Sequence, residues 1–138
     1  MLLLRDILYR NANIRSQKTA VIFYEGPSMT YGELDQTSNK LANALIALGT
    51  KRGDRIAVLL NNGLEFVVAY WAAIKIGAIF LPLNVWYKAP EIIHAIHDST
   101  SSTLILGKEF ADTIVSNRNE LGPVSTSIVV ADDPPAPQ

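Results

Sequence analysis

From residue 56 to residue 130, short apolar runs alternate with longer segments in which apolar residues recur every three or four positions. The short runs are IAVLL (56–60), AIFLPL (78–83), TLIL (103–106) and TSIVV (126–130). A run that is apolar on both faces is typical of a strand buried in a parallel sheet. The pattern therefore predicts four buried strands of one sheet.

The segments between these runs have helical periodicity and recognisable helix ends. Asn62 can cap a helix that carries Glu65 three residues later, and Pro90 suits the first position of the next helix. A further helix is expected within 108–121. Strands that alternate with helices predict an α/β fold, with a mostly parallel sheet and helices on both faces. Ligands of such sheets bind beyond the carboxyl ends of the strands.

The residues before this alternation predict two helices and a hairpin. One helix covers 2–10, and the pattern of 19–31 is typical of a short hairpin. Thr30 and Glu33 then form a capping box at the start of a second helix, which ends before Gly49. The inner face of this second helix carries Leu34, Leu41, Leu45 and Leu48.

Pro82 stands near the end of the second apolar run. Proline removes a ladder hydrogen bond, so it is confined to strand ends, edge strands and bulges. We therefore expect the strand to end there, and the chain to leave the sheet at its carboxyl edge through Leu83 and Asn84.

Composition places the chain among packed globular domains. It has 138 residues, of which 49% are hydrophobic and 18% charged, enough for one domain with its own core. The net charge of −1 gives no general attraction to nucleic acid or to an anionic membrane. The chain has no cysteine, which excludes disulfides, thiolate nucleophiles and Cys-type zinc sites and fits a reducing compartment. We predict a cytoplasmic protein.

No segment reads as a signal peptide or a membrane span. Only three leucines precede Arg5, and the longest apolar run, 66–74, is far shorter than the about 20 residues that a span requires. Residues 1–130 are expected to form one α/β unit. Residues 131–138 contain three prolines and are expected to form a Pro-rich loop or tail.

The glycines form no phosphate-binding loop. Neither G-x-G-x-x-G nor G-x-x-x-x-G-K-[ST] occurs. The hydroxyl-rich stretch STSSTLILGK (99–108) differs from a phosphate-binding loop in its order. A phosphate-binding loop follows a strand and contains glycines, whereas here the Ser/Thr cluster precedes the strand and includes no glycine. A solvated loop between helix and strand is the expected structure.

Two histidines and an RGD tripeptide also have simple structural interpretations. His94 and His97 can share a helix face, but no third ligand is placed with them, so we expect partly exposed histidines near a helix end. Asp54 and Arg55 are expected in a turn before a strand. The residues alone assign no catalytic group and no metal ligand.

Five short patterns occur in a characteristic order. They are Thr30-Tyr31-Gly32-Glu33-Leu34, Gly53-Asp54-Arg55-Ile56, Asn62-Gly63-Leu64-Glu65-Phe66, Lys75-Ile76-Gly77-Ala78 and Pro82-Leu83-Asn84. Together they resemble the start of the adenylate-forming (AMP-binding) superfamily, which includes acyl-CoA synthetases, aryl-CoA ligases, luciferases and peptide-synthetase adenylation domains. The resemblance spans residues 1 to about 130.

This resemblance implies the N-terminal subdomain of that fold and a two-step reaction. ATP, with Mg²⁺, and a carboxylic acid give an acyl-adenylate and pyrophosphate, and the CoA thiol then displaces AMP to form a thioester. The family's phosphate loop, its adenine- and ribose-binding segments and its catalytic lysine are expected beyond residue 138. We therefore expect this segment alone neither to catalyse the reaction nor to bind ATP, Mg²⁺ or CoA.

One position departs from the family pattern. Many members have Pro-Arg after Pro-Leu-Asn, and in some CoA ligases that arginine reaches a CoA phosphate. Here Val85 and Trp86 stand there, followed by Tyr87 and Lys88. Trp offers no bidentate phosphate contact but can stack on an adenine. Trp86 and Lys88 are thus the candidate residues near CoA. The alternative is that Trp86 and Tyr87 pack against a subdomain surface.

Two functions stay open. The first is the N-terminal fragment of an ATP-dependent carboxylic acid–CoA ligase, inactive alone, whose complete form uses a fatty or aromatic acid, ATP and CoA. A carrier protein as the acceptor is an alternative to CoA. The second is a stand-alone, non-catalytic α/β binding or interaction module. Neither predicts nucleic-acid binding, and homo-oligomer formation stays open. A sheet that lacks its remaining strands is expected to expose an unpaired edge and apolar surface.

Overall fold

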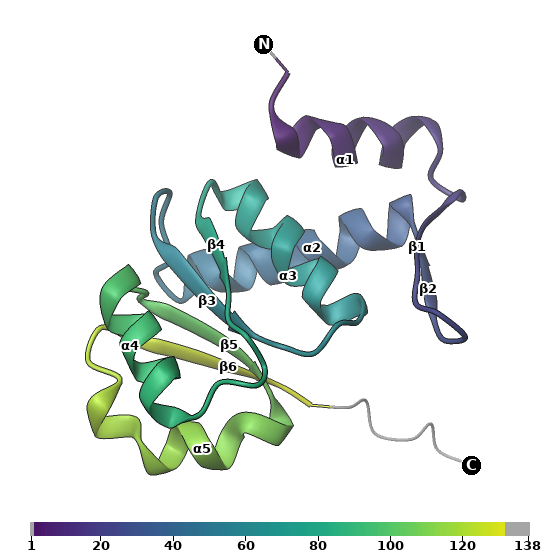
Figure 1. The fold of residues 1–138 in the computed structure, drawn as a ribbon. Coiled ribbons are helices and arrows are strands. Elements are labelled where there is room, and N and C mark those ends of the chain that lie inside the picture. Colours follow the sequence, from purple (N-terminus) through teal and green to yellow (C-terminus); the bar gives the residue numbers. More distant parts are fainter. Residues whose placement is uncertain (1, 132–138) are drawn as a thin grey trace.

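The computed structural model describes residues 2–131 of the chain (Figure 1). The predicted Pro-rich tail lies, from residue 132 on, outside the described residues. The helices are α1 (Leu4–Ile14), α2 (Tyr31–Ala47), α3 (Leu64–Ile76), α4 (Ala89–Ser99) and α5 (Ala111–Ser116), with the short 3₁₀ helices η1 (Lys108–Phe110) and η2 (Arg118–Glu120). The strands are β1 (Thr19–Ile22), β2 (Ser28–Thr30), β3 (Arg55–Leu59), β4 (Ile79–Pro82), β5 (Thr103–Gly107) and β6 (Thr126–Val130).

Strands β3 to β6 form a parallel sheet in the order β4-β3-β5-β6, and β1 and β2 form an antiparallel hairpin. Helices α2 and α3 cover one face of the parallel sheet, and α4 and α5 cover the other. Side chains alternate across a strand, so Ile56 and Val58 face α2 and α3, whereas Ala57 and Leu59 face α4 and α5. All four are fully buried. The predicted α/β fold, with helices on both faces of a mostly parallel sheet, is confirmed.

Strand β6 differs from the buried strand that its sequence predicts. It lies at the edge of the sheet, and its side chains alternate between half-buried and exposed. Ile128 and Val130 pack against the α2–α3 side of the core, while Ser127 and Val129 are exposed. An apolar run cannot by itself distinguish an interior strand from an edge strand.

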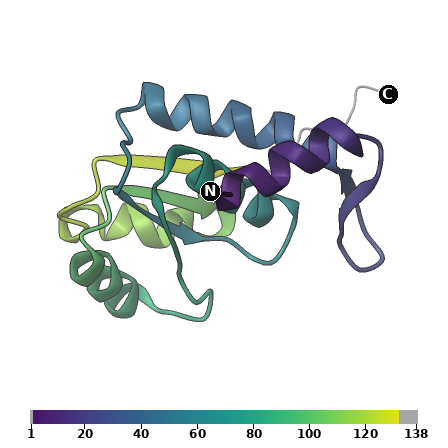
Figure 2. The same cartoon turned by 90° about the horizontal axis from the view of Figure 1, so that it is seen from above.

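Helix α1 and the β1–β2 hairpin form an additional layer outside α2 and α3. Leu8 of α1 packs with Leu34 of α2 and Val68 of α3, and all three are buried. Figures 1 and 2 show this layer at the end of the molecule remote from α4 and α5. Within residues 2–131, no helix combines the length and the apolar character that crossing a membrane requires.

The capping box of α2 is present as predicted. The Glu33 backbone N–H donates to Thr30 Oγ1 at 3.2 Å, and the Thr30 N–H donates to a Glu33 carboxylate oxygen at 2.8 Å. The hydrogen bonds from the Thr30 backbone and side chain favour the ionised carboxylate, so they hold the pKa of Glu33 below its usual value.

Several other helix predictions need correction. The first helix, expected over 2–10, is α1 at Leu4–Ile14. Leu48, expected on the inner face of the second helix, is the exposed C-cap residue of α2. Asn62 does not cap α3: the N-cap is Gly63, whose extended backbone places the helix start one residue later. Helix α4 begins at Ala89, so Pro90 is its second residue rather than its first. The single helix expected within 108–121 is instead α5 flanked by η1 and η2. Sequence patterns locate helix ends only to within a few residues, because caps and tertiary packing compete there.

Pro82 is the last residue of β4, as predicted. It lies opposite Val58 of β3, and the next residue, Leu83, donates its N–H to the Val58 carbonyl at 2.8 Å. Alternate residues of a strand point their N–H groups to opposite sides, so the Pro82 nitrogen faces the open edge beyond β4. The proline therefore costs no ladder hydrogen bond.

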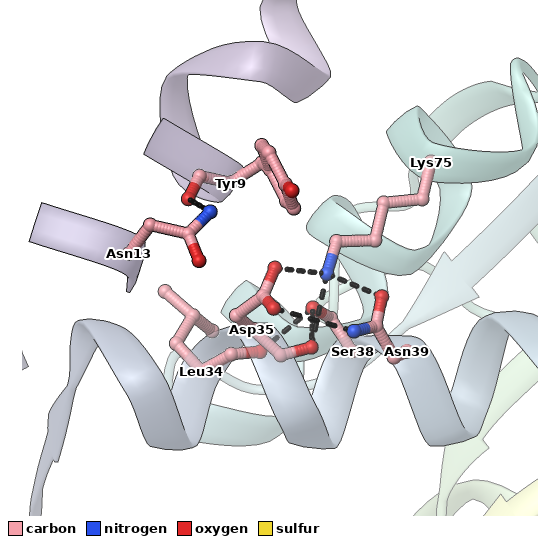
Figure 3. Close-up of polar contacts among 7 residues, drawn as sticks. All are labelled: Tyr9, Asn13, Leu34, Asp35, Ser38, Asn39 and Lys75. Atoms are coloured by element: carbon pink, nitrogen blue, oxygen red, sulfur yellow. Dashed lines mark hydrogen bonds and ion pairs between the residues drawn. The ribbon is translucent and has the colours of Figure 1, made fainter. Parts of the chain in front are cut away.

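Lys75 joins α3 to α2 through three short contacts (Figure 3). Its ammonium donates to Asp35 Oδ1 at 2.7 Å, to the Asp35 carbonyl at 2.9 Å and to Asn39 Oδ1 at 2.7 Å. The side chains of Lys75 and Asp35 are only 13% and 18% exposed. Because all three donors of the ammonium are used, this contact fixes how the end of α3 lies on α2.

We predict that Lys75→Ala lowers the free energy of unfolding by about 1–3 kcal/mol, since the Asp35 carboxylate loses its charged partner while it stays largely buried. Urea unfolding followed by circular dichroism measures the change. Lys40→Ala, an exposed lysine on α2, is the control and should change the free energy by less than about 0.5 kcal/mol. Equal effects of the two substitutions would show that the Lys75 contact does not stabilise the fold.

Among residues 2–131, no strand pairs with the outer edge of β6. Hollows lie beside this strand on both faces of the sheet, of about 300 Å³ next to α5 and about 860 Å³ next to α2 and α3. We predict that the purified chain self-associates through this edge as its concentration rises. Light scattering after size exclusion should show that Val129→Lys on β6 reduces the association, while Ile46→Lys on α2 does not. A cooperative monomer at every concentration would contradict this prediction and favour a stand-alone module.

Candidate functional site

All four parallel strands present their carboxyl ends at one edge of the sheet. β3 ends at Leu59, β4 at Pro82, β5 at Gly107 and β6 at Val130. The loops that follow these residues are therefore the ones that can meet a ligand in this fold. Figure 1 shows them on the side where β4 turns toward α4 and β5 leads toward α5.

A cleft of about 860 Å³ opens at this edge, between α2, α3 and the β5–β6 side of the sheet. Leu60, Ile105 and Ile128 contribute its apolar floor, and Met29 of the hairpin lies at its rim. The polar groups that line it include Lys40, Asn61, Asn62, Glu65 and Glu109.

One hydrogen bond links two of the strand ends across the cleft. The Asn61 amide, two residues after β3, donates to Glu109 Oε1 in η1 at 2.6 Å. Both side chains are exposed. The bond holds the loops after β3 and β5 together at the carboxyl edge, and it leaves the carboxylate of Glu109 facing the cleft as a hydrogen-bond acceptor.

These residues do not fit the phosphates of ATP or CoA. Lys40 is the one cationic residue that lines the cleft, and the lining also includes the acidic residues Glu65 and Glu109. Phosphate sites use clustered cations and backbone N–H groups. Among residues 2–131, no group of three or more His, Asp or Glu side chains could hold a metal ion. We therefore derive no catalytic step from this cleft.

The candidate residues Trp86 and Lys88 lie together, but away from the cleft. After β4, Leu83 is buried and Asn84 starts a turn, with its Oδ1 accepting the Trp86 N–H at 3.0 Å and its carbonyl accepting the Tyr87 N–H at 3.0 Å. This turn leaves the Trp86 side chain 83% exposed. Lys88 is the N-cap of α4 and donates its N–H to Glu91 Oε2 at 2.5 Å. β4 and β6 are opposite edges of the sheet, which separates this turn from the cleft.

The two histidines are exposed residues of α4, as predicted, and His97 lies in its last turn. His97 Nε2 is 2.7 Å from the Glu120 carbonyl oxygen, a contact that ties the end of α4 to η2. Asp54 lies in the turn before β3, where its carboxylate accepts the Lys51 N–H at 2.7 Å, so the interpretation of the RGD tripeptide is also confirmed.

The Ser/Thr-rich stretch before β5 is a loop, as predicted, but it is not solvated throughout. Ser101 and Thr103 are buried, and their hydroxyls meet those of Ser99 at 2.6 Å and Thr50 at 3.3 Å. The stretch lies at the amino end of β5, opposite the carboxyl edge. Sequence reasoning missed the burial because hydroxyl residues are usually exposed, and only the packed fold supplies their partners.

Comparison with known proteins assigns the class. A parallel α/β sheet with helices on both faces and a carboxyl-edge cleft describes many nucleotide-handling proteins. The family model described as AMP-binding enzyme matches residues 8–138. The chain therefore belongs to the AMP-binding enzyme family, and the resemblance stated from the sequence is confirmed.

The curated relatives include CoA ligases. The long-chain-fatty-acid–CoA ligase FadD13 of Mycobacterium tuberculosis is 37% identical over 98 residues, which are 71% of this chain and 20% of the relative. The 3-hydroxybenzoate–CoA/4-hydroxybenzoate–CoA ligase of Thauera aromatica is 35% identical over 121 residues, 88% of this chain and 23% of the relative. The chain thus spans about a fifth to a quarter of the length of the curated relatives it matches.

Solved structures of CoA ligases have the same fold. The anthranilate CoA ligase AuaEII in complex with anthranoyl-AMP matches 94% of this chain and 25% of its own, with a TM-score of 0.87 and 30% identity. The N-terminal domain of FACL13 from Mycobacterium tuberculosis matches 94% of this chain and 34% of its own, also with a TM-score of 0.87 and 30% identity. The described fold is therefore that of a part of the N-terminal domain of CoA ligases.

Proposed function

We propose that this chain is the N-terminal portion of an ATP-dependent carboxylic acid–CoA ligase and that residues 1–130 serve as its structural subdomain. The observation that carries the proposal is the family match over residues 8–138 together with the fold shared with two CoA ligase structures. The complete enzyme would join a carboxylic acid to CoA through an acyl-adenylate, with ATP and Mg²⁺. Its expected compartment is the cytoplasm.

The proposed acid is a fatty or aromatic one. The relatives favour this class, because they include long-chain-fatty-acid and hydroxybenzoate CoA ligases. The cleft of this segment lacks clustered cations for phosphate and a metal-binding group, so the proposal assigns ATP, Mg²⁺ and CoA binding chiefly to other parts of the ligase.

A chimera tests the structural role. Residues 8–131 of this chain replace the matching segment of FadD13, and we expect the chimera to form CoA thioesters of long-chain fatty acids. Val58→Asp in the chimera is the control, since it buries a charge in the centre of the sheet and should abolish activity. A folded but inactive chimera would contradict the proposal. Acid-dependent ATP–pyrophosphate exchange by the chain alone would contradict the assignment of catalysis to other segments.

We also propose that Trp86 and Lys88 lie beside CoA in the complete enzyme. The support is that both residues follow β4 at the carboxyl edge of the sheet. The turn held by Asn84 leaves Trp86 exposed to solvent. A tryptophan can stack on the adenine of CoA, which at other aromatic–base contacts is worth about 1–3 kcal/mol.

In the active chimera, Trp86→Ala should therefore raise the KM for CoA by about fivefold or more, with kcat and the KM for ATP unchanged. Trp86→Phe keeps an aromatic face and should restore most of the affinity. Steady-state kinetics with CoA as the varied substrate measures both. An unchanged KM for CoA in Trp86→Ala would favour the alternative, that Trp86 and Tyr87 pack against another subdomain.

A further inference from the structure

The loop between β3 and α3 carries an asparagine followed directly by a glycine, Asn62 and Gly63. It is the one place in the chain where glycine follows asparagine. In such a pair, the side-chain Cγ of the asparagine and the backbone nitrogen of the glycine can close a five-membered ring. Glycine has no Cβ, so nothing shields its nitrogen and its backbone rotates freely. The sequence therefore supplies a reactive pair, and the fold decides whether it reacts.

The fold leaves this pair outside regular structure. β3 ends at Leu59 and α3 begins at Leu64, so the pair lies in the loop that joins them (Figure 1). Asn62 is exposed. Gly63 is the N-cap of α3, and its φ of 178° and ψ of −176° are extended rather than helical. Ring closure at Asn62 therefore requires rotation of a loop, and no strand or helix has to open.

The two reacting groups are also free of hydrogen bonds. Among residues 2–131, neither the Asn62 side-chain amide nor the Gly63 N–H has a hydrogen-bond partner, so both face water. The preceding residue, Asn61, is held, because its amide donates to Glu109 Oε1 at 2.6 Å. Two further asparagines outside the α-helices are held through their side chains, Asn84 by the Trp86 N–H and Asn117 by a main-chain carbonyl. Asn62 thus combines the reactive neighbour with an unrestrained amide.

We propose that Asn62 and Gly63 are a site of spontaneous deamidation, which makes the loop after β3 more acidic as the protein ages. The Gly63 nitrogen forms a bond to Cγ of Asn62 and loses its proton, and the Cγ–Nδ2 bond breaks to release ammonia. Water then opens the cyclic imide at one of its two carbonyl groups, which gives aspartate or isoaspartate. No electrons are transferred, and water is the only other reactant.

The modification changes the cleft at the carboxyl edge. Asn62 lines this cleft with Lys40, Glu65 and Glu109, so its product is a third carboxylate against one cation. The aspartyl product is compatible with the fold, because a negative charge just before α3 interacts favourably with the positive end of the helix dipole. The isoaspartyl product inserts one methylene into the main chain, directly after Asn61, and should weaken the hydrogen bond from Asn61 to Glu109.

Peptide mapping of the full chain tests the proposal. The chain is incubated at neutral and at mildly alkaline pH, and trypsin then releases residues 56–75, between Arg55 and the bond after Lys75. Mass spectrometry should show a gain of one mass unit at residue 62, as aspartyl and isoaspartyl forms that separate by chromatography. The conversion should be faster at the higher pH, because the Gly63 nitrogen must lose its proton. The measurement requires neither ATP nor CoA, so it is independent of the proposed ligase function.

The unfolded chain provides the reference rate. In guanidinium the loop has no restraint from β3 or α3, and the intrinsic reactivity of the pair is measured. The folded chain should convert within about tenfold of that rate, which corresponds to at most about 1.4 kcal/mol of additional activation free energy.

Two variants identify the reacting groups. Gly63→Ala places a methyl group beside the nitrogen and should slow the conversion about tenfold or more. This methyl would lie 3.0 Å from Glu65 Oε2, at the end of an exposed side chain that can move aside. Asn62→Gln keeps the glycine but requires a larger ring, and it should not convert. Asn61, in the same peptide, is the internal control and should stay unmodified. Circular dichroism verifies that each variant is folded.

Three results would overturn the proposal. In the first, peptide 56–75 of the folded chain keeps its mass while that of the unfolded chain converts, which would show that the fold protects the pair. In the second, Gly63→Ala or Asn62→Gln converts as fast as the unmodified chain. In the third, Asn61 converts as fast as Asn62, which would show that the loop has no specific site.

Discussion

The burial of strand β3 constrains where the other elements of the structure lie. This strand has a neighbouring strand on each side and helices on both faces. Its central side chains are fully buried and divide between the two core clusters. The β3–α3–β4 and β4–α4–β5 connections run in opposite directions along the sheet, so right-handed crossovers place α3 and α4 on opposite faces of β3. The alanines of α3, Ala69, Ala72 and Ala73, allow that helix to lie close against the sheet.

This arrangement has a consequence for function, because it collects the polar loop residues at one edge. The loops after β3 and β5 meet through Asn61 and Glu109. The loop after β4, with Trp86, lies at the opposite side of the same edge. The carboxyl edge of the sheet therefore carries two separate surfaces, one at Asn61 and Glu109 and the other at Trp86, each available to a ligand or to another part of a protein. The cleft beside Asn61 and Glu109 has Lys40 as the one cation among its lining residues.

The hollows on both faces of β6 have the same physical origin as its partly exposed side chains. The apolar side chains of β6 on the α2–α3 face are only half-buried, so the hydrophobic core at this edge of the sheet is incomplete. In contrast, β4 at the other edge ends in a proline whose nitrogen faces outward, which blocks pairing at that position. The two edges are therefore not equivalent: β4 resists further strands, and β6 can accept one.

The periodicity of the sequence determined the order of the strands and α-helices from residue 55 on, and the capping box of α2, because these depend on local side chains and on alternation. It did not show that 3₁₀ helices flank α5. The ordered patterns from Thr30 to Asn84 were enough to identify the family. Tertiary structure decided what no local pattern contains. It placed β6 at an edge, buried Ser101 and Thr103 beside hydroxyl partners, and moved the cap of α3 from Asn62 to Gly63. It also separated Trp86 from the cleft. Each of these outcomes depends on which residues far apart in the sequence become neighbours in the fold. The free energy that selects one arrangement of neighbours over another is a sum over the whole packed core, so no local pattern contains it.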